Sequence, residues 1–141
     1  MVHALEEIRR VLVRDGILID LRPLADRSSV EVVSASETRR AGLVDQLPED
    51  VANDEAANRS VVQAGERVWF KRERETFFPF NYYWDSPQEM QEYVEVEWGD
   101  FITIDEKVLQ RTRSMCAVAN ADARIRIPLK MLITRWRKQE A

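Results

Sequence analysis

The sequence has little of several residue types, and each shortage excludes a class of protein. Its 141 residues include one Cys and one His. This content excludes a disulfide scaffold and a four-ligand structural zinc site. No stretch approaches the roughly 18 consecutive apolar residues of a membrane-spanning helix, and the charged run from Met1 to Arg10 lacks the apolar segment of a signal peptide. We therefore expect a cytoplasmic protein whose residues 1–141 form a single domain.

The charge balance is slightly acidic, with 21 basic and 25 acidic residues and a formal net charge of −4. That balance is unlike the basic surface of a general nucleic-acid binder. Basic and aromatic residues do alternate near Arg67–Arg74 and Arg124–Lys138. Such alternation is what the exposed face of a strand produces by itself. We do not expect nucleic acid as a partner.

The first twenty residues predict a helix followed by a strand. Leu5, Ile8 and Leu12 fall on one face of a helix over 4–12, which Asp15-Gly16 ends, with Gly16 supplying a left-handed turn. The apolar run 17–21 is typical of a strand buried inside a sheet. Helix, turn and strand form the second half of a βαβ unit. We expect the preceding strand to lie outside these residues.

Further elements follow from capping and turn residues. Pro48 is a favoured first helical residue and opens a helix over 48–64 that Gly65 ends. Ser86, Pro87 and Glu89 form a capping-box pattern that opens a helix to about 96. Asp105 caps a helix to about 120. The remaining predictions are a hairpin or loop excursion over 30–44, a strand over 66–78 that includes Val68, an irregular aromatic segment over 79–84, and a strand over 124–136 with a bulge or break at Pro128.

The opening motif resembles one segment of the class I S-adenosylmethionine-dependent methyltransferases. Ala4-Leu-Glu-Glu-Ile-Arg-Arg-Val-Leu-Val-Arg-Asp-Gly-Ile-Leu-Ile-Asp20 is similar to the family's helix before its fifth strand, with Arg14-Asp15-Gly16 in place of Pro-Gly-Gly. The element order that follows, with a last strand at Lys130–Arg135, is also similar. The resemblance covers the C-terminal half of that fold and implies an α/β, Rossmann-like half-fold. Its sheet would be mixed, with three main strands at 17–22, 66–78 and 124–136, the last antiparallel, and helices packed against it.

The resemblance implies S-adenosylmethionine as the cofactor, but the family's cofactor residues lie in its N-terminal half. The four Gly residues here are widely separated, at Gly16, Gly42, Gly65 and Gly99. A close-spaced Gly turn, which lets backbone amides approach a cofactor, is absent from the sequence. We therefore expect no catalytic residue, no metal site and no cofactor bound by this chain alone.

Two groups of residues are candidates for binding a small-molecule substrate. Asp20 ends the apolar strand, and ligands gather at the ends of strands in open α/β sheets. Its carboxylate could accept a hydrogen bond from a substrate hydroxyl or amine. With Arg22 beside it, Asp20 could equally satisfy loop amides. The second group belongs to the aromatic cluster 77–84 and comprises Phe80, Tyr82, Tyr83 and Trp84. Such residues line ligand pockets, but more often they close a core or form an interface.

Other reactive residue types have a simpler interpretation. We expect His3 in a frayed first turn and Cys116 on an apolar helix face to be inert, because no second His could act as a base. The carboxylates over 89–97 predict a solvated helix face, since carboxylates without a pattern of further ligands are weak evidence for a metal site.

These patterns lead to two functional hypotheses. The first is a methyltransferase-related protein that retains the substrate-side half, as a component of a split enzyme or a residual small-molecule binder. The strand 17–21 would then stand as an exposed edge that pairs with another chain. Its partner would be a second copy in a homodimer, or a separate cofactor-binding half. The alternative is a non-enzymatic α+β interaction module whose aromatic cluster 77–84 is an interface.

Overall fold

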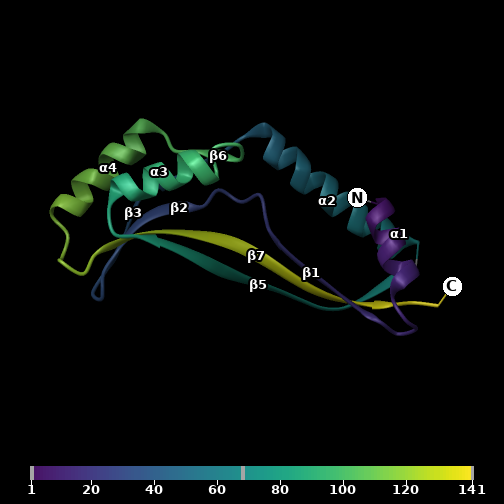
Figure 1. Ribbon diagram of the computed structural model, residues 1–141. Coiled ribbons are helices and arrows are strands. Elements are labelled where there is room, and N and C mark those ends of the chain that lie inside the picture. Colours follow the sequence, from purple (N-terminus) through teal and green to yellow (C-terminus); the bar gives the residue numbers. More distant parts are fainter. Residues whose placement is uncertain (1, 68, 141) are drawn as a thin grey trace. The chain divides into compact units, whose positions relative to one another are not determined.

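The computed structural model describes residues 2–67 and 69–140 (Figure 1). These residues form a mixed α/β protein with four helices and an antiparallel sheet of five strands. The helices are α1 (Val2–Val11), α2 (Pro48–Glu66), α3 (Pro87–Glu97) and α4 (Glu106–Ala117). The strands are β1 (Ile17–Pro23), β2 (Ser29–Val33), β3 (Thr38–Leu43), β4 (Asp45–Gln46), β5 (Phe70–Trp84), β6 (Ile102–Thr103) and β7 (Arg124–Lys138).

The chain divides into two compact units. Unit 1 comprises Met1–Leu24, Ala52–Phe78 and Met131–Ala141, and unit 2 comprises Ala25–Val51 and Pro79–Lys130. Each unit has its own cluster of buried apolar residues. Both β5 and β7 contribute one end to each unit.

The sheet is larger than the three main strands expected from the sequence. Its order is β1-β7-β2-β3, and β5 also pairs with β7. The additional strands are the hairpin β2–β3, which confirms the hairpin predicted over 30–44 and pairs with β7 through Glu31–Val33. The expected antiparallel last strand is present, since β7 pairs antiparallel with β1 and β2. Separately, β4 and β6 form a two-stranded sheet.

In unit 1, α1 and the C-terminal part of α2 pack on the strands through a small apolar core. Leu5, Ala64 and Phe70 are buried there, and Leu18 and Trp136 pack against them. The predicted helices over 4–12 and 48–64 are confirmed. Helix α2 packs through small residues. It buries the stripe Ala57, Ser60 and Ala64, whose small side chains allow a close approach, while Val62 is 59% exposed.

Strand β1 is present as expected, but its side chains are distributed differently. Ile19 and Leu21 are 52% and 56% exposed, whereas Asp20 and Arg22 keep only 20% and 16% of their side-chain surface exposed. Because side chains alternate between faces, the two polar residues share the inner face with Leu18. The expectation of a strand buried on both faces is therefore wrong. The expected edge position is confirmed, because within the described residues β1 pairs only with β7.

In unit 2, α3 and α4 cover the β2–β3 hairpin and the adjoining ends of β5 and β7 (Figure 1). The core is apolar, with Val30, Met90, Ile125 and Ile127 each fully buried. The predicted caps are confirmed. The Ser86 hydroxyl accepts a hydrogen bond from the Glu89 amide, and the Asp105 carboxylate accepts one from the Lys107 amide. The Glu89 carboxylate accepts a hydrogen bond from the backbone amide of Asp85 rather than from that of Ser86.

Three local predictions are corrected. The left-handed residue after α1 is Asp15, with φ of 56°, and Gly16 does not adopt positive φ. The segment 79–84 is regular, because β5 runs from Phe70 through Pro79 to Trp84; the predicted Val68 lies outside the described residues. Strand β7 also continues through Pro128, so the strand break that was one of the two alternatives predicted there does not occur.

Although β7 is unbroken, the alternation of its buried residues shifts by one residue after Pro128, as a bulge produces. The buried residues are Ile125 and Ile127 before the proline, and Leu132 and Thr134 after it. An odd-numbered set therefore gives way to an even-numbered set, and each unit buries its own set of β7 side chains.

We predict that Gly42→Ala destabilises unit 2, because a Cβ at Gly42 would lie 2.5 Å from Cγ2 of Val108 on α4. Overpacking of this kind costs about 1 to 3 kcal/mol in the free energy of unfolding, measured by urea denaturation. Val108→Ala should recover part of the loss in the double variant. The matched control is Gly65→Ala in α2, where no atom lies within 4 Å. It should stabilise by about 0.5 to 1 kcal/mol through helix propensity. Equal effects of the two substitutions would contradict the close α4–β3 packing.

Candidate functional site

The predicted residues Asp20 and Arg22 lie together in unit 1, where they form a polar cluster with α2. Nε of Arg22 lies 3.3 Å from Oδ2 of Asp20, and Nη1 lies 3.8 Å from Oδ1 of Asp54. Nη2 of Arg22 donates a 2.6 Å hydrogen bond to Oδ1 of Asn58. Asp54 and Asn58 were not predicted as site residues. Because these two residues are four apart in the sequence, they lie on the same face of the helix. This spacing is the sequence signal that could have identified them.

This cluster has two carboxylates for one guanidinium, and its hydrogen bonding is incomplete. Oδ2 of Asp20 and both Nε and Nη1 of Arg22 are buried without a hydrogen bond, although the ion pairs bring them close. The strong donors of Arg22 face Asp20, Asp54 and Asn58, so they are directed at the protein itself. Asp20 therefore pairs with Arg22 rather than with loop amides. The arrangement ties β1 to α2 and fixes which face of β1 points inward.

A cavity of about 260 Å³ lies beside this cluster. Asp20 is its charged lining residue, and the rest of the wall is apolar: Leu5, Ile8, Leu18, Ile19, Leu21, Val61, Ala64, Phe70 and Trp136. A volume of this size is just below the range of about 300 to 1,000 Å³ that holds typical small-molecule ligands. The cavity follows β1, the edge strand of the sheet, and exposes apolar surface there.

The predicted aromatic residues lie in unit 2, where Trp84 belongs to the core and Tyr82 packs against it. Trp84 is 8% exposed, and Tyr82 lies 4.8 Å from Trp98 between ring centroids, edge to face. Tyr93 of α3 completes the group at 5.4 Å from Trp84 and 5.3 Å from Trp98. Burial is the main cause that raises the pKa of Tyr93. Tyr93 and Trp98 were not predicted as members of this group, although Tyr93 lies about one helical turn after the buried Met90.

Phe80 and Tyr83 are the more exposed members of the aromatic group, at 50% and 42%. The Phe80 ring packs edge to face on Tyr82 at 5.2 Å, and the Arg124 guanidinium lies 5.3 Å from the Tyr83 ring. The structure therefore brings Phe80, Tyr82 and Trp84 together, and it brings Asp20 and Arg22 together. The two groups belong to different units.

The remaining reactive residues do not assemble into a catalytic arrangement. Burial raises the pKa of the Cys116 thiol, which keeps the sulfur protonated and unreactive. His3 is exposed and contacts Glu6. Over residues 2–67 and 69–140, no group of three His, Cys, Asp or Glu side chains could hold a metal ion. None of the helices in this part of the chain is long and apolar enough to cross a membrane.

Carboxylates neutralise several of the basic residues along β5 and β7. Glu73 accepts a hydrogen bond from Nε of Arg137, and Nε of Arg135 lies 2.9 Å from its other oxygen. Arg126 pairs with Glu31 at 2.6 Å, and Arg124 pairs with Asp85 at 2.7 Å. These pairs reduce the positive field that a polyanion would need.

No protein-family model matches this chain, and neither a curated protein nor a solved structure matches it significantly.

We predict that Arg22→Met lowers the free energy of unfolding by about 2 to 3 kcal/mol, because it removes the cation that faces two partly buried carboxylates. Asp20→Asn in the same chain should recover about 1 kcal/mol by removing one of those charges. Urea denaturation of the two single variants and the double variant measures the coupling. Strictly additive effects would show that Asp20 and Arg22 do not interact.

A second prediction concerns Glu73, whose pKa is held below its ordinary value of 4.5 mainly by the hydrogen bond from Arg137. A depressed folded pKa stabilises the protein above the unfolded value, and this contribution is lost as the pH falls through the folded value. Between about pH 5 and about pH 3, the native chain should therefore lose more stability than Glu73→Gln. Urea denaturation at both pH values tests this, and parallel losses in the two proteins would contradict it.

Proposed function

We propose that the chain is the substrate-side half of a class I methyltransferase-like, Rossmann-related fold, and that it acts with a cofactor-binding half. That half could belong to the same polypeptide or to another one. Alone, these residues would bind a partner or a small molecule rather than transfer a methyl group. The proposal depends chiefly on one observation, the strand order around β7 in unit 1.

In unit 1, β7 lies between β1 and β5. It pairs antiparallel with β1 over Ile17–Pro23, and its residues Trp136 and Arg137 contact Arg72 and Glu73 of β5. The resemblance implies this order, with a late strand inserted antiparallel between two earlier ones. Helix α1 before β1 and helix α2 before β5 also stand in the implied order. These features support the proposal.

The edge of β1 is where a further strand would be added. Within the described residues β1 pairs only with β7, so its other side presents unpaired backbone groups. Ile19 and Leu21 are more than half exposed beside it. Their outward direction follows from the inward direction of Asp20 and Arg22. An apolar edge of this kind is a surface for strand addition by a partner half or, in its absence, by a second copy.

The residues present do not fit S-adenosylmethionine. A close cofactor approach needs Gly residues that face open space, and three of the four lie against their own chain. A Cβ at Gly16, Gly42 or Gly99 would lie within 3 Å of Val13, Val108 or Glu95. Gly65 faces open space but lies within α2. We therefore assign no step of methyl transfer to this chain.

The test combines sedimentation with calorimetry. At micromolar concentration we expect the chain to sediment as a dimer and to show no heat of binding with S-adenosylmethionine. Ile19→Lys with Leu21→Lys should give a folded monomer, because two charges on the exposed face oppose strand pairing. Both positions are largely exposed, so the free energy of unfolding should change by less than about 0.5 kcal/mol.

The matched control is Val11→Lys with Val62→Lys, two residues that are 64% and 59% exposed on α1 and α2. This variant should remain dimeric. A folded monomer of the native chain would contradict the role of the β1 edge. Micromolar affinity for S-adenosylmethionine would contradict the assignment of the cofactor site to another half.

The alternative function is a non-enzymatic interaction module that uses the aromatic cluster. The exposure of Phe80 and Tyr83 on β5 favours it. The same sedimentation experiment separates the two functions. Dissociation by Phe80→Ser with Tyr83→Ser, and not by the lysine substitutions in β1, would identify the aromatic surface as the interface.

A further inference from the structure

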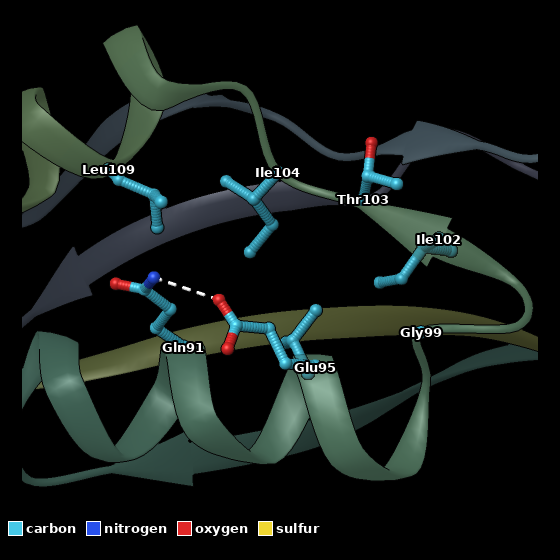
Figure 2. Close-up of a pocket in the computed structure, with 8 residues that line it drawn as sticks. Gln91, Glu95, Gly99, Ile102, Thr103, Ile104 and Leu109 are labelled. Carbon is cyan, nitrogen blue, oxygen red and sulfur yellow. Dashed lines mark hydrogen bonds between the residues drawn. The ribbon is translucent and has the colours of Figure 1, made fainter.

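A second cavity lies wholly within unit 2, between α3, β6 and the first turns of α4 (Figure 2). Its volume is about 280 Å³. Val94 and Leu109, which are 4% and 6% exposed, form its apolar wall together with Ile102 and Ile104. Gln91, Glu95 and Thr103 supply its polar groups. Figure 2 shows the Gln91 and Glu95 side chains extending from α3 toward Ile104 and Leu109.

Hydrogen bonds from α4 orient the polar side of this cavity. Nη2 of Arg113 donates a 2.8 Å bond to Oε1 of Gln91, and Nη1 of the same guanidinium bonds to Glu106 at 3.2 Å. With its oxygen held by Arg113, the Gln91 amide turns its Nε2 to Oε1 of Glu95 at 2.8 Å. The Glu95 carboxylate is therefore positioned at the cavity by a chain of three side chains.

Glu95 retains unused acceptor capacity. A carboxylate has about four lone-pair positions, and within the described residues Glu95 accepts the single bond from Gln91 and pairs with no cation. Its neighbour Arg113 is committed to Gln91 and Glu106. Glu95 thus presents a negative charge beside an apolar wall, and the net charge of −4 also favours a cation.

We propose that this cavity binds a small primary amine with an apolar body. The body would lie against Val94, Ile104 and Leu109, and the ammonium group would donate to the Glu95 carboxylate. The cavity volume is at the lower limit of ligand pockets, so the ligand is the size of a single substituted ring. The site goes beyond the proposed function and does not depend on it, because it uses no residue of β1 or of unit 1.

The same helix provides an internal comparison. Nε2 of Gln88 donates a 2.8 Å bond to Oε1 of Glu92, the same i,i+4 pair in the same geometry as Gln91 and Glu95. Glu92 does not line the cavity. Any effect of Glu95 that Glu92 does not share therefore comes from its position at the cavity rather than from helix stability.

The test is calorimetric titration of the full chain with 2-phenylethylamine and with its neutral analogue 2-phenylethanol. We expect the amine to bind about tenfold more tightly than the alcohol, because its hydrogen bond to the carboxylate is charge-assisted. Glu95→Gln should reduce the amine affinity about tenfold, to that of the alcohol, and Glu92→Gln should leave it unchanged. Ile104→Trp should abolish binding of both compounds by filling the cavity.

Thermal unfolding of each variant confirms that it is folded. Glu95 is exposed, so Glu95→Gln keeps the test decisive even where Ile104→Trp fails to fold. Equal affinities for amine and alcohol would overturn the proposal, as would no detectable binding of either compound. It would also be overturned if Glu92→Gln weakened amine binding as much as Glu95→Gln.

Discussion

Strands β1, β2 and β5 all pair with β7, so the sheet depends on one strand of 15 residues. The same strand contributes to both cores, because Ile125 and Ile127 belong to the core of unit 2 and Trp136 packs against the core of unit 1. An antiparallel central strand satisfies its backbone groups on both sides, which makes it the most constrained part of a sheet. Because β7 follows β1, β2 and β5 by many residues, all three pairings join segments that are far apart in the sequence.

The direction of β1 side chains follows from a polar contact rather than from hydrophobicity. Asp20 and Arg22 face α2, and their ion pairs with each other and with Asp54 oblige Ile19 and Leu21 to face outward. A one-residue shift would bury the two apolar side chains and expose the charged pair. Since a partly buried charge is costly without its partner, the network selects one register. The apolar edge of the sheet is a consequence of that selection.

Local signals in the sequence were sufficient for the elements whose ends have specific chemistry. Pro48, Ser86 and Asp105 each open a helix where expected, because capping depends on neighbours a few residues away. The two-unit division and the inward Asp20–Arg22 pair were not predictable. The inward direction of the pair depends on contacts of Arg22 with Asp54 and Asn58, which lie more than thirty residues along the chain. Pro79 also favoured an irregular segment, but in the part of the chain that the structure describes β5 pairs only with β7 and tolerates a proline at an edge.

Charge pairing determines which ligands these two units can accept. In unit 1, Arg22, Arg135 and Arg137 already face carboxylates, so an anionic ligand would have to displace an existing partner. Displacement would leave that carboxylate unpaired, and its desolvation would oppose binding. In unit 2, Glu95 has no cation to displace within the described residues. A cationic ligand there would gain its interaction without breaking another, and this asymmetry makes an amine a more favourable ligand than a phosphate or a carboxylate.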